Sequence, residues 1–193
     1  MVTLLSNLII NFFLSKYIVN HVGVDAYGYI QLAINMISFF TVVTIALNSM
    51  AARFVSVSYF QTNHSEALRY YSSVFFSNII IVLLLTPFVV YGIIFLDLFI
   101  KIESEFLISV QILFLLFFIS FVINLFSVNA NIAFYIRNKL DIQSIINMFK
   151  FLIYGTCLFL FFRFFTTDII YVGIAFLISI VLTQAFTWLT SSL

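Results

Sequence analysis

Six long runs of apolar residues, separated by short polar segments, divide the sequence. By their polar boundaries the runs cover residues 2–19, 27–58, 72–96, 106–136, 145–162 and 169–189. Each run is close to or above the ~20 residues with which an α-helix crosses a hydrocarbon core of about 30 Å. The pattern predicts an all-α, polytopic transmembrane helix bundle of about six helices, in a single domain over residues 1–193.

Two connections refine this architecture. Segment 61–71 is expected to form a short amphipathic helix at the membrane interface, capped by Asn63 or Ser65. Basic residues are more frequent after the second and fourth runs than after the others, which predicts cytoplasmic termini by the positive-inside rule. The first group is Arg53, Arg69, Arg137, Lys139 and Lys150, and the second is Lys16, Lys101 and Arg163.

Composition excludes several classes of protein. Apolar residues make up 64% of the chain and charged residues only 8%, far below the roughly 25% charged residues of a soluble domain. The formal net charge of +1 provides no basic surface for nucleic acid. A single cysteine, Cys157, cannot form an internal disulfide and is expected to pack inside the fifth helix.

Polar residues inside the second and fourth runs fall on narrow faces, each within a sector of ~60° at ~100° per residue. On the second run they are Gln31, Asn35, Ser38, Ser49, Arg53 and Ser56, and on the fourth they are Ser109, Ser120, Asn124, Ser127, Asn131 and Asn138. One interpretation is that these side chains join helices through hydrogen bonds. The other is that both faces line a shared aqueous cavity that binds a polar solute such as a sugar, with Gln31, Asn35, Arg53, Asn124 and Asn131 as candidate lining residues.

Charged and helix-breaking positions leave similar alternatives. Lys150, in the fifth run, either extends its side chain to the interface or faces the cavity, where it would attract an anionic group. Arg53 has the same two interpretations. Pro87 removes a backbone hydrogen bond inside the third run, so it either acts as a hinge or only bends the helix.

Catalytic patterns are not expected in this chain. The two histidines, His21 and His64, fall on opposite sides of the predicted membrane. The sequence contains no nucleophile-elbow, zinc-protease or P-loop motif. We therefore expect a protein that is not an enzyme and that has no catalytic residues, metal or cofactor.

Segment 4–32, LLSNLIINFFLSKYIVNHVGVDAYGYIQL, and the later SMAARFVS segment resemble the start of the bacterial Wzx-type polysaccharide flippases. These flippases belong to the multidrug/oligosaccharidyl-lipid/polysaccharide exporter superfamily. The family pattern of a glycine, an acidic segment and a Tyr-Gly pair is matched by Gly23, Asp25 and Tyr27-Gly28. The Arg-aromatic pair at the end of the second helix is matched by Arg53 and Phe54.

The resemblance implies a transporter of the bacterial inner membrane that moves an undecaprenyl-pyrophosphate-linked oligosaccharide, such as an O-antigen or capsular repeat unit, from the cytoplasmic to the periplasmic leaflet. Its partners would be this lipid-linked oligosaccharide and membrane lipid. The resemblance implies that Arg53 and Lys150 would bind the pyrophosphate by charge, and that the side-chain amides of the second and fourth runs would bind sugar hydroxyls.

The family fold has two bundles, whereas six helices correspond to the N-terminal bundle. We therefore expect a truncated or partial protein, which would assemble with a second half-transporter or with another copy of itself. A non-transporting membrane subunit or scaffold is the alternative function, and a membrane-embedded glycan enzyme ranks third.

Overall fold

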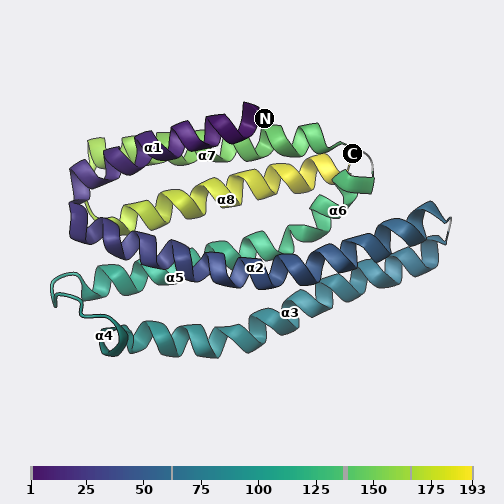
Figure 1. Cartoon of the computed structure of the whole chain (residues 1–193), viewed down its shortest axis with the longest axis horizontal. Coiled ribbons are helices and arrows are strands. Elements are labelled where there is room, and N and C mark those ends of the chain that lie inside the picture. The colour runs from purple at the N-terminus through teal and green to yellow at the C-terminus, as the bar shows by residue number, and fades with distance from the viewer. Residues whose placement is uncertain (1, 62, 137–138, 166, 193) are drawn as a thin grey trace.

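The structure is a computed structural model of the whole chain, and it describes all residues except 1, 62, 137–138, 166 and 193. The described residues form helices and no strand (Figure 1). The helices are α1 (Val2–Val22), α2 (Val24–Phe60), α3 (His64–Ile94), α4 (Leu96–Phe99), α5 (Leu107–Phe126), α6 (Val128–Ile136), α7 (Leu140–Phe164) and α8 (Ile169–Ser192).

Four helices within the described residues are long and apolar enough to cross a membrane: His64–Ile94, Leu107–Phe126, Asp141–Phe164 and Ile169–Thr190. They correspond to α3, α5, α7 and α8. The predicted all-helical fold with transmembrane helices is therefore confirmed. The predicted number of six spans is not confirmed, because α1 and α2 are not among these four.

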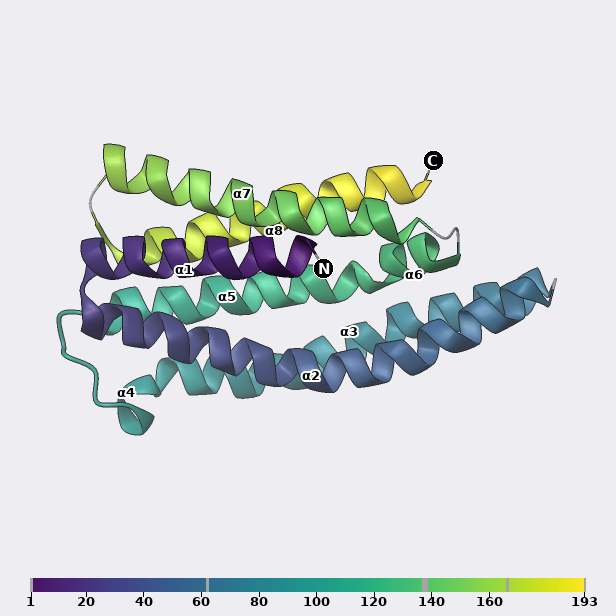
Figure 2. The ribbon, with the colours of Figure 1, turned by 45° about the horizontal axis from the view of Figure 1, so that its top comes forward.

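The helices run side by side, with α5 in the middle of the bundle (Figures 1 and 2). α5 packs against α2, α3 and α8, while α7 packs against α8 and α1. Leu113, Phe117 and Val172 are almost completely buried in the main core. By contrast, Phe88 and Phe164 are each 75% exposed, as is expected of side chains that face lipid.

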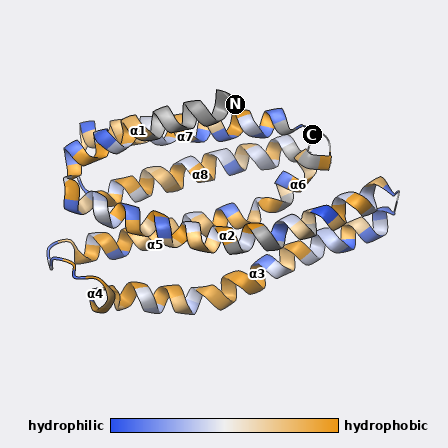
Figure 3. Cartoon of the chain, in the orientation of Figure 1, coloured by the Kyte–Doolittle hydropathy of each residue, from blue (hydrophilic) through white to orange (hydrophobic). Residues whose placement is uncertain are grey.

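Hydrophobic residues predominate along α3 and α5, whereas hydrophilic positions gather near the tip of the α2–α3 hairpin and in the connection before α5 (Figure 3). These two regions lie at opposite ends of the bundle (Figure 1). Polar residues at both ends and apolar residues between them are the distribution that a bilayer requires.

A sharp corner joins α1 to α2 at Gly23. Its φ of 90° lies in the left-handed region, which glycine adopts without the steric cost of a Cβ atom. Gly23 is the single residue between the two helices, and α1 and α2 pack against each other.

The α2–α3 hairpin is longer than the rest of the bundle and extends past its end (Figure 2). Asn63 caps α3, as predicted, by accepting a hydrogen bond from the backbone N–H of Glu66 at 3.3 Å. The short, separate helix predicted for residues 61–71 is wrong, because α3 starts at His64 and continues to Ile94. Buried Ala67 and Val74 keep this first part of α3 packed, so it needs no break before the apolar run.

The predicted fourth helix, residues 106–136, is interrupted at Ser127 and forms two helices, α5 and α6. The Ser127 hydroxyl donates to the carbonyl oxygen of Ile123 at 3.1 Å, in the place of the backbone N–H. That N–H instead donates to the carbonyl oxygen of Asn124 at 3.2 Å. The Ser127 hydroxyl thus bonds the carbonyl that its own backbone N–H has left, which accompanies the break.

α3 passes through Pro87 without ending. Proline cannot donate a hydrogen bond to the preceding turn, and the adjacent Thr86 hydroxyl donates to the carbonyl oxygen of Val82 at 2.7 Å. The hydroxyl thus bonds a carbonyl in the turn that Pro87 weakens. Whether Pro87 acts as a hinge stays a prediction.

Candidate functional site

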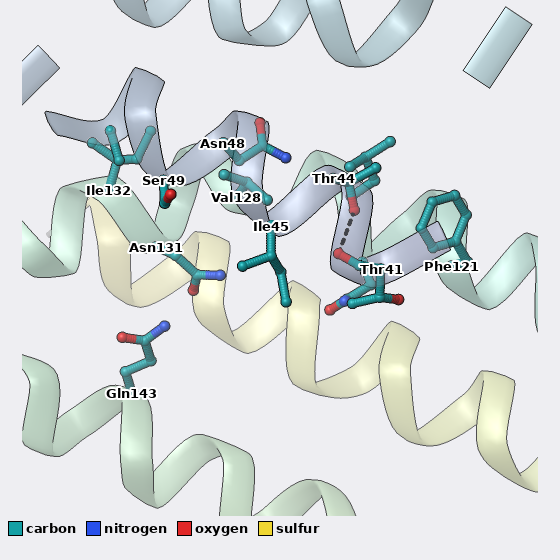
Figure 4. A pocket seen from close by; sticks show the side chains of 13 residues that line it. Thr41, Thr44, Ile45, Asn48, Ser49, Phe121, Val128, Asn131, Ile132 and Gln143 are labelled. Atoms are coloured by element: carbon teal, nitrogen blue, oxygen red, sulfur yellow. Dashed lines mark hydrogen bonds between the residues drawn. The ribbon is translucent and has the colours of Figure 1, made fainter. Parts of the chain in front are cut away.

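The two predicted polar faces meet in a cavity of about 400 Å³ near α6, here called the α6-end cavity. Ser49 of α2, Asn124 of α5 and Asn131 of α6 line it, and Gln143 of α7 closes it from the opposite side. Figure 4 shows Asn131, Gln143 and Ser49 around the same space, whereas the amide of Asn48 points to the other side of α2. The cavity therefore combines polar groups from four helices.

Two amides in this wall have unused hydrogen-bonding capacity. Within the part of the chain that the structure describes, the side chains of Asn131 and Gln143 form no hydrogen bond with the protein. Unsatisfied polar groups inside a membrane cost several kcal/mol each unless water or a ligand pairs with them. The α6-end cavity is therefore a place for water or for a polar solute.

Lys150 lies in the next cavity along α2, a space of about 270 Å³ here called the Lys150 cavity. Its Nζ atom is 5.2 Å from the centroid of the Phe176 ring, a cation–π contact. Ser38 of α2 and Ser179 of α8 are among the residues that share this cavity. The side chain of Lys150 therefore faces the interior of the bundle and not the membrane interface.

A third cavity, of about 440 Å³, lies toward the corner between α1 and α2 and is called the α1-end cavity. Gln31 lines it and donates from Nε2 to the Tyr27 hydroxyl at 2.6 Å. Ile34 and Tyr154 line both this cavity and the Lys150 cavity, so the two are neighbours.

The three cavities follow one another along α2, with α7 contributing to each, and we call the series the polar corridor. Lys150 is the one charged side chain among the described residues that line it. Among those same described residues, no aspartate or glutamate lines the cavities to neutralise Lys150. The corridor is therefore lined mainly by apolar side chains, with amides in the two end cavities and one ammonium in the middle one.

Some predicted residues lie elsewhere. Asn35 and Arg53 are exposed on α2 and line none of the three cavities. Asn138 lies outside the described residues. The hydroxyls of Ser56 and Ser120 donate to carbonyl oxygens of their own helices. These two hydroxyls therefore neither join helices nor offer a donor to a solute.

Thr41, Thr44 and Asn48 of α2 line the α6-end cavity, although they are not on the predicted polar face of that helix. Their spacing of three and then four residues places them on one face, ~110° from the predicted one. This second polar face was visible in the sequence. Only the structure shows that it, too, faces the corridor.

Other polar side chains join helices, as the first interpretation of the polar faces requires. Gln184 of α8 donates from Nε2 to Oδ1 of Asn124 at 2.9 Å. Gln111 of α5 donates to the carbonyl oxygen of Ile93 at 3.1 Å, near the end of α3. Asn124 thus serves both interpretations, because it bonds to Gln184 and also lines the α6-end cavity.

Among the described residues, no group of three or more His, Cys, Asp and Glu side chains is placed to hold a metal ion. The chemical groups that the corridor offers are therefore neutral amides, hydroxyls and one ammonium. Such groups bind hydroxyls and anions by hydrogen bonds and charge.

No protein-family model matches the chain, and no solved structure matches it. The chain is similar to the uncharacterized membrane protein EpsK of Bacillus subtilis (strain 168), with 28% identity over 149 residues. The matched region is 77% of this chain and 30% of the relative, so the chain spans less than a third of the relative's length. The apolar helices of the chain and its similarity to this membrane protein together identify the chain as a membrane protein with transmembrane helices.

Proposed function

We propose that the chain forms part of the translocation path of a flippase for a lipid-linked oligosaccharide. The polar corridor is the observation that carries this proposal, because it places unpaired amides and one ammonium in series along the bundle. The resemblance of segment 4–32 to Wzx-type flippases supports the class of substrate, an undecaprenyl-pyrophosphate-linked repeat unit of the bacterial inner membrane.

Each corridor group has a role in this proposal. The amides of Asn131 and Gln143 bind sugar hydroxyls, since an amide offers both a donor and an acceptor. Lys150 attracts the pyrophosphate, and its charge stays available because none of the described residues that line the corridor is a carboxylate. Arg53 acts outside the corridor, where its exposed guanidinium, about two turns before the end of α2, suits anionic headgroups.

Equilibrium binding of a fluorescent undecaprenyl-pyrophosphate-linked disaccharide to the full chain in detergent tests the proposal. We expect Asn131→Leu and Gln143→Leu to weaken binding about fivefold each, the effect of one lost net hydrogen bond of about 1 kcal/mol. Lys150→Met should weaken binding more, because it removes a charge-assisted contact. Asn20→Leu, which changes an exposed amide of α1 outside the corridor, is the matched control.

Equal binding by the corridor variants, the control and the unmodified chain would contradict the proposal. That outcome would favour the second candidate, a non-transporting membrane subunit in which polar side chains only join helices. The bonds from Gln184 to Asn124 and from Gln111 to Ile93 support this candidate. It predicts that Gln184→Leu lowers thermal stability while Asn131→Leu does not.

A further inference from the structure

The helix break at Ser127 lies in the wall of the α6-end cavity. Asn124 and Leu125 line the cavity before the break, and Val128, Asn131 and Ile132 line it after the break. A change of angle between α5 and α6 would therefore move one part of the wall while the other part stays in place. No other end of the corridor is built in this way among the described residues.

α6 also packs separately from the main core. Its buried Ile132 joins Val55 of α2 and Val74 of α3 in a small cluster of its own. The central residues of α5, including Phe117 and Phe121, belong to the large core cluster. The break thus separates a helix of the main core from α6, whose buried residues Ala130, Ile132 and Phe134 lie outside that core cluster. α6 packs as a unit against α2, α7 and α8.

Two amides from other helices hold the chain just before the break, from opposite sides of α5. Gln184 of α8 donates to Oδ1 of Asn124, and Asn78 of α3 donates from Nδ2 to the carbonyl oxygen of Leu125 at 3.4 Å. Gln184 therefore also orients the side-chain amide of Asn124, because the hydrogen bond keeps Oδ1 of Asn124 toward α8.

The bond made by Asn78 is long, and the other end of this amide has no partner. Asn78 is 1% exposed, and its Oδ1 atom is buried without a hydrogen-bond donor. A buried, half-satisfied amide destabilises the arrangement that contains it. The contact at Leu125 is therefore weak enough to be exchanged.

We propose that α6 pivots at Ser127 to open and close the α6 end of the polar corridor, and that Asn78 and Gln184 hold the pivot in the arrangement described here. This inference takes the identity of the transported molecule from the proposed function. The movement of α6 itself does not depend on that molecule. Helices broken next to a cavity commonly supply such movements in membrane proteins.

The test measures how fast a membrane-impermeant thiol reagent modifies single cysteines in the full chain, in membranes and without substrate. The background variant is Cys157→Ser, which removes the one native cysteine. Asn131→Cys reports on α6 and Ser49→Cys reports on α2, and both positions face the α6-end cavity (Figure 4). Asn78→Leu and Gln184→Leu each release one side of the pivot, and Ser77→Ala, in the same turn of α3, is the control.

We expect Asn78→Leu or Gln184→Leu to raise the modification rate at position 131 about fivefold, the factor that corresponds to one net hydrogen bond. The rate at position 49 should be unchanged, and Ser77→Ala should alter neither rate. Equal acceleration at both positions would mean that the bundle loosens as a whole, and would overturn the pivot. Unchanged rates at position 131 in both variants would also overturn it.

The outcome is independent of the proposed function. If the rates change as expected but the lipid-linked disaccharide does not bind, the pivot stands and the proposed cargo is wrong. If the disaccharide binds but the rates do not change, the corridor keeps its cargo and α6 is a fixed wall.

Discussion

Gly173 decides how closely α8 approaches α5. A Cβ atom at this position would lie 2.9 Å from a terminal methyl carbon of Leu116 and 3.2 Å from the Cβ atom of the same residue. The terminal methyl of Leu116 can rotate away, but its Cβ atom cannot, so a larger residue here requires α5 and α8 to shift by a few tenths of an ångström. Small residues at such contacts are typical of transmembrane helix packing.

We expect Gly173→Val to destabilise the folded chain by about 1–3 kcal/mol through overpacking. Gly92→Val is the matched control, because a Cβ atom on Gly92 meets nothing within 4 Å. The measurement is the midpoint of thermal unfolding in detergent, followed by circular dichroism. Equal midpoints for the two variants would show that the contact between α5 and α8 tolerates an added side chain.

At the scale of elements, the corner between α1 and α2 is the position where backbone conformation matters most. Gly23→Ala should destabilise the chain by about 1 kcal/mol, because alanine at a φ of 90° is strained. Gly28→Ala, five residues later within α2, should stabilise it by up to about 1 kcal/mol through helix propensity. Chemical denaturation of both variants tests this difference in sign, and two shifts of the same sign would contradict it.

The sequence was sufficient to predict the helical elements but not every boundary between them. The apolar runs located α8 and the start of α5 closely, because lipid and core both require apolar side chains along these helices. The break at Ser127 could not be predicted, since a serine inside a helix usually points to solvent or bonds back without ending the helix. The extension of α3 to His64 depended on packing of Val74 against Val55 and Ile132, a tertiary contact.

The site was predicted in part, for a related reason. Asn124, Asn131, Gln31 and Lys150 line the corridor, whereas Asn35 and Arg53, on the same predicted face as Gln31, do not. A helical face of α2 that is ~60° wide meets different neighbours along 37 residues, first α1 and then α5 and α6. Which part of a polar face is covered depends on where those neighbours end, and sequence periodicity holds no information about that.

At the scale of the whole molecule, the bundle has two polar ends that a membrane would separate. Ser65, in the first turn of α3, and Ser104, in the connection before α5, are both exposed. The hairpin tip and this connection lie at opposite ends of the bundle (Figure 1). In a Cys157→Ser background, Ser65→Cys should react with an impermeant maleimide only after cells are permeabilised. Ser104→Cys should react on intact cells.

This expectation follows from the basic residues Arg53 and Arg69 near the hairpin tip, which favour the cytoplasmic side. Labelling of both positions on intact cells would contradict the membrane placement of α3, which is the helix that connects the two ends. Exchanged labelling would retain the placement and reverse the orientation.

The length of α2 has a consequence for the lipid around the protein. At 1.5 Å per residue its 37 residues extend over ~55 Å, whereas a bilayer with its headgroups is about 45 Å thick. For α2 to lie wholly within such a bilayer, it would have to tilt by ~35° from the membrane normal. The angle of the α2–α3 hairpin, which is also one wall of the corridor and a support for α6, thus becomes dependent on lipid chain length. We expect thicker membranes to straighten the hairpin and thinner membranes to incline it.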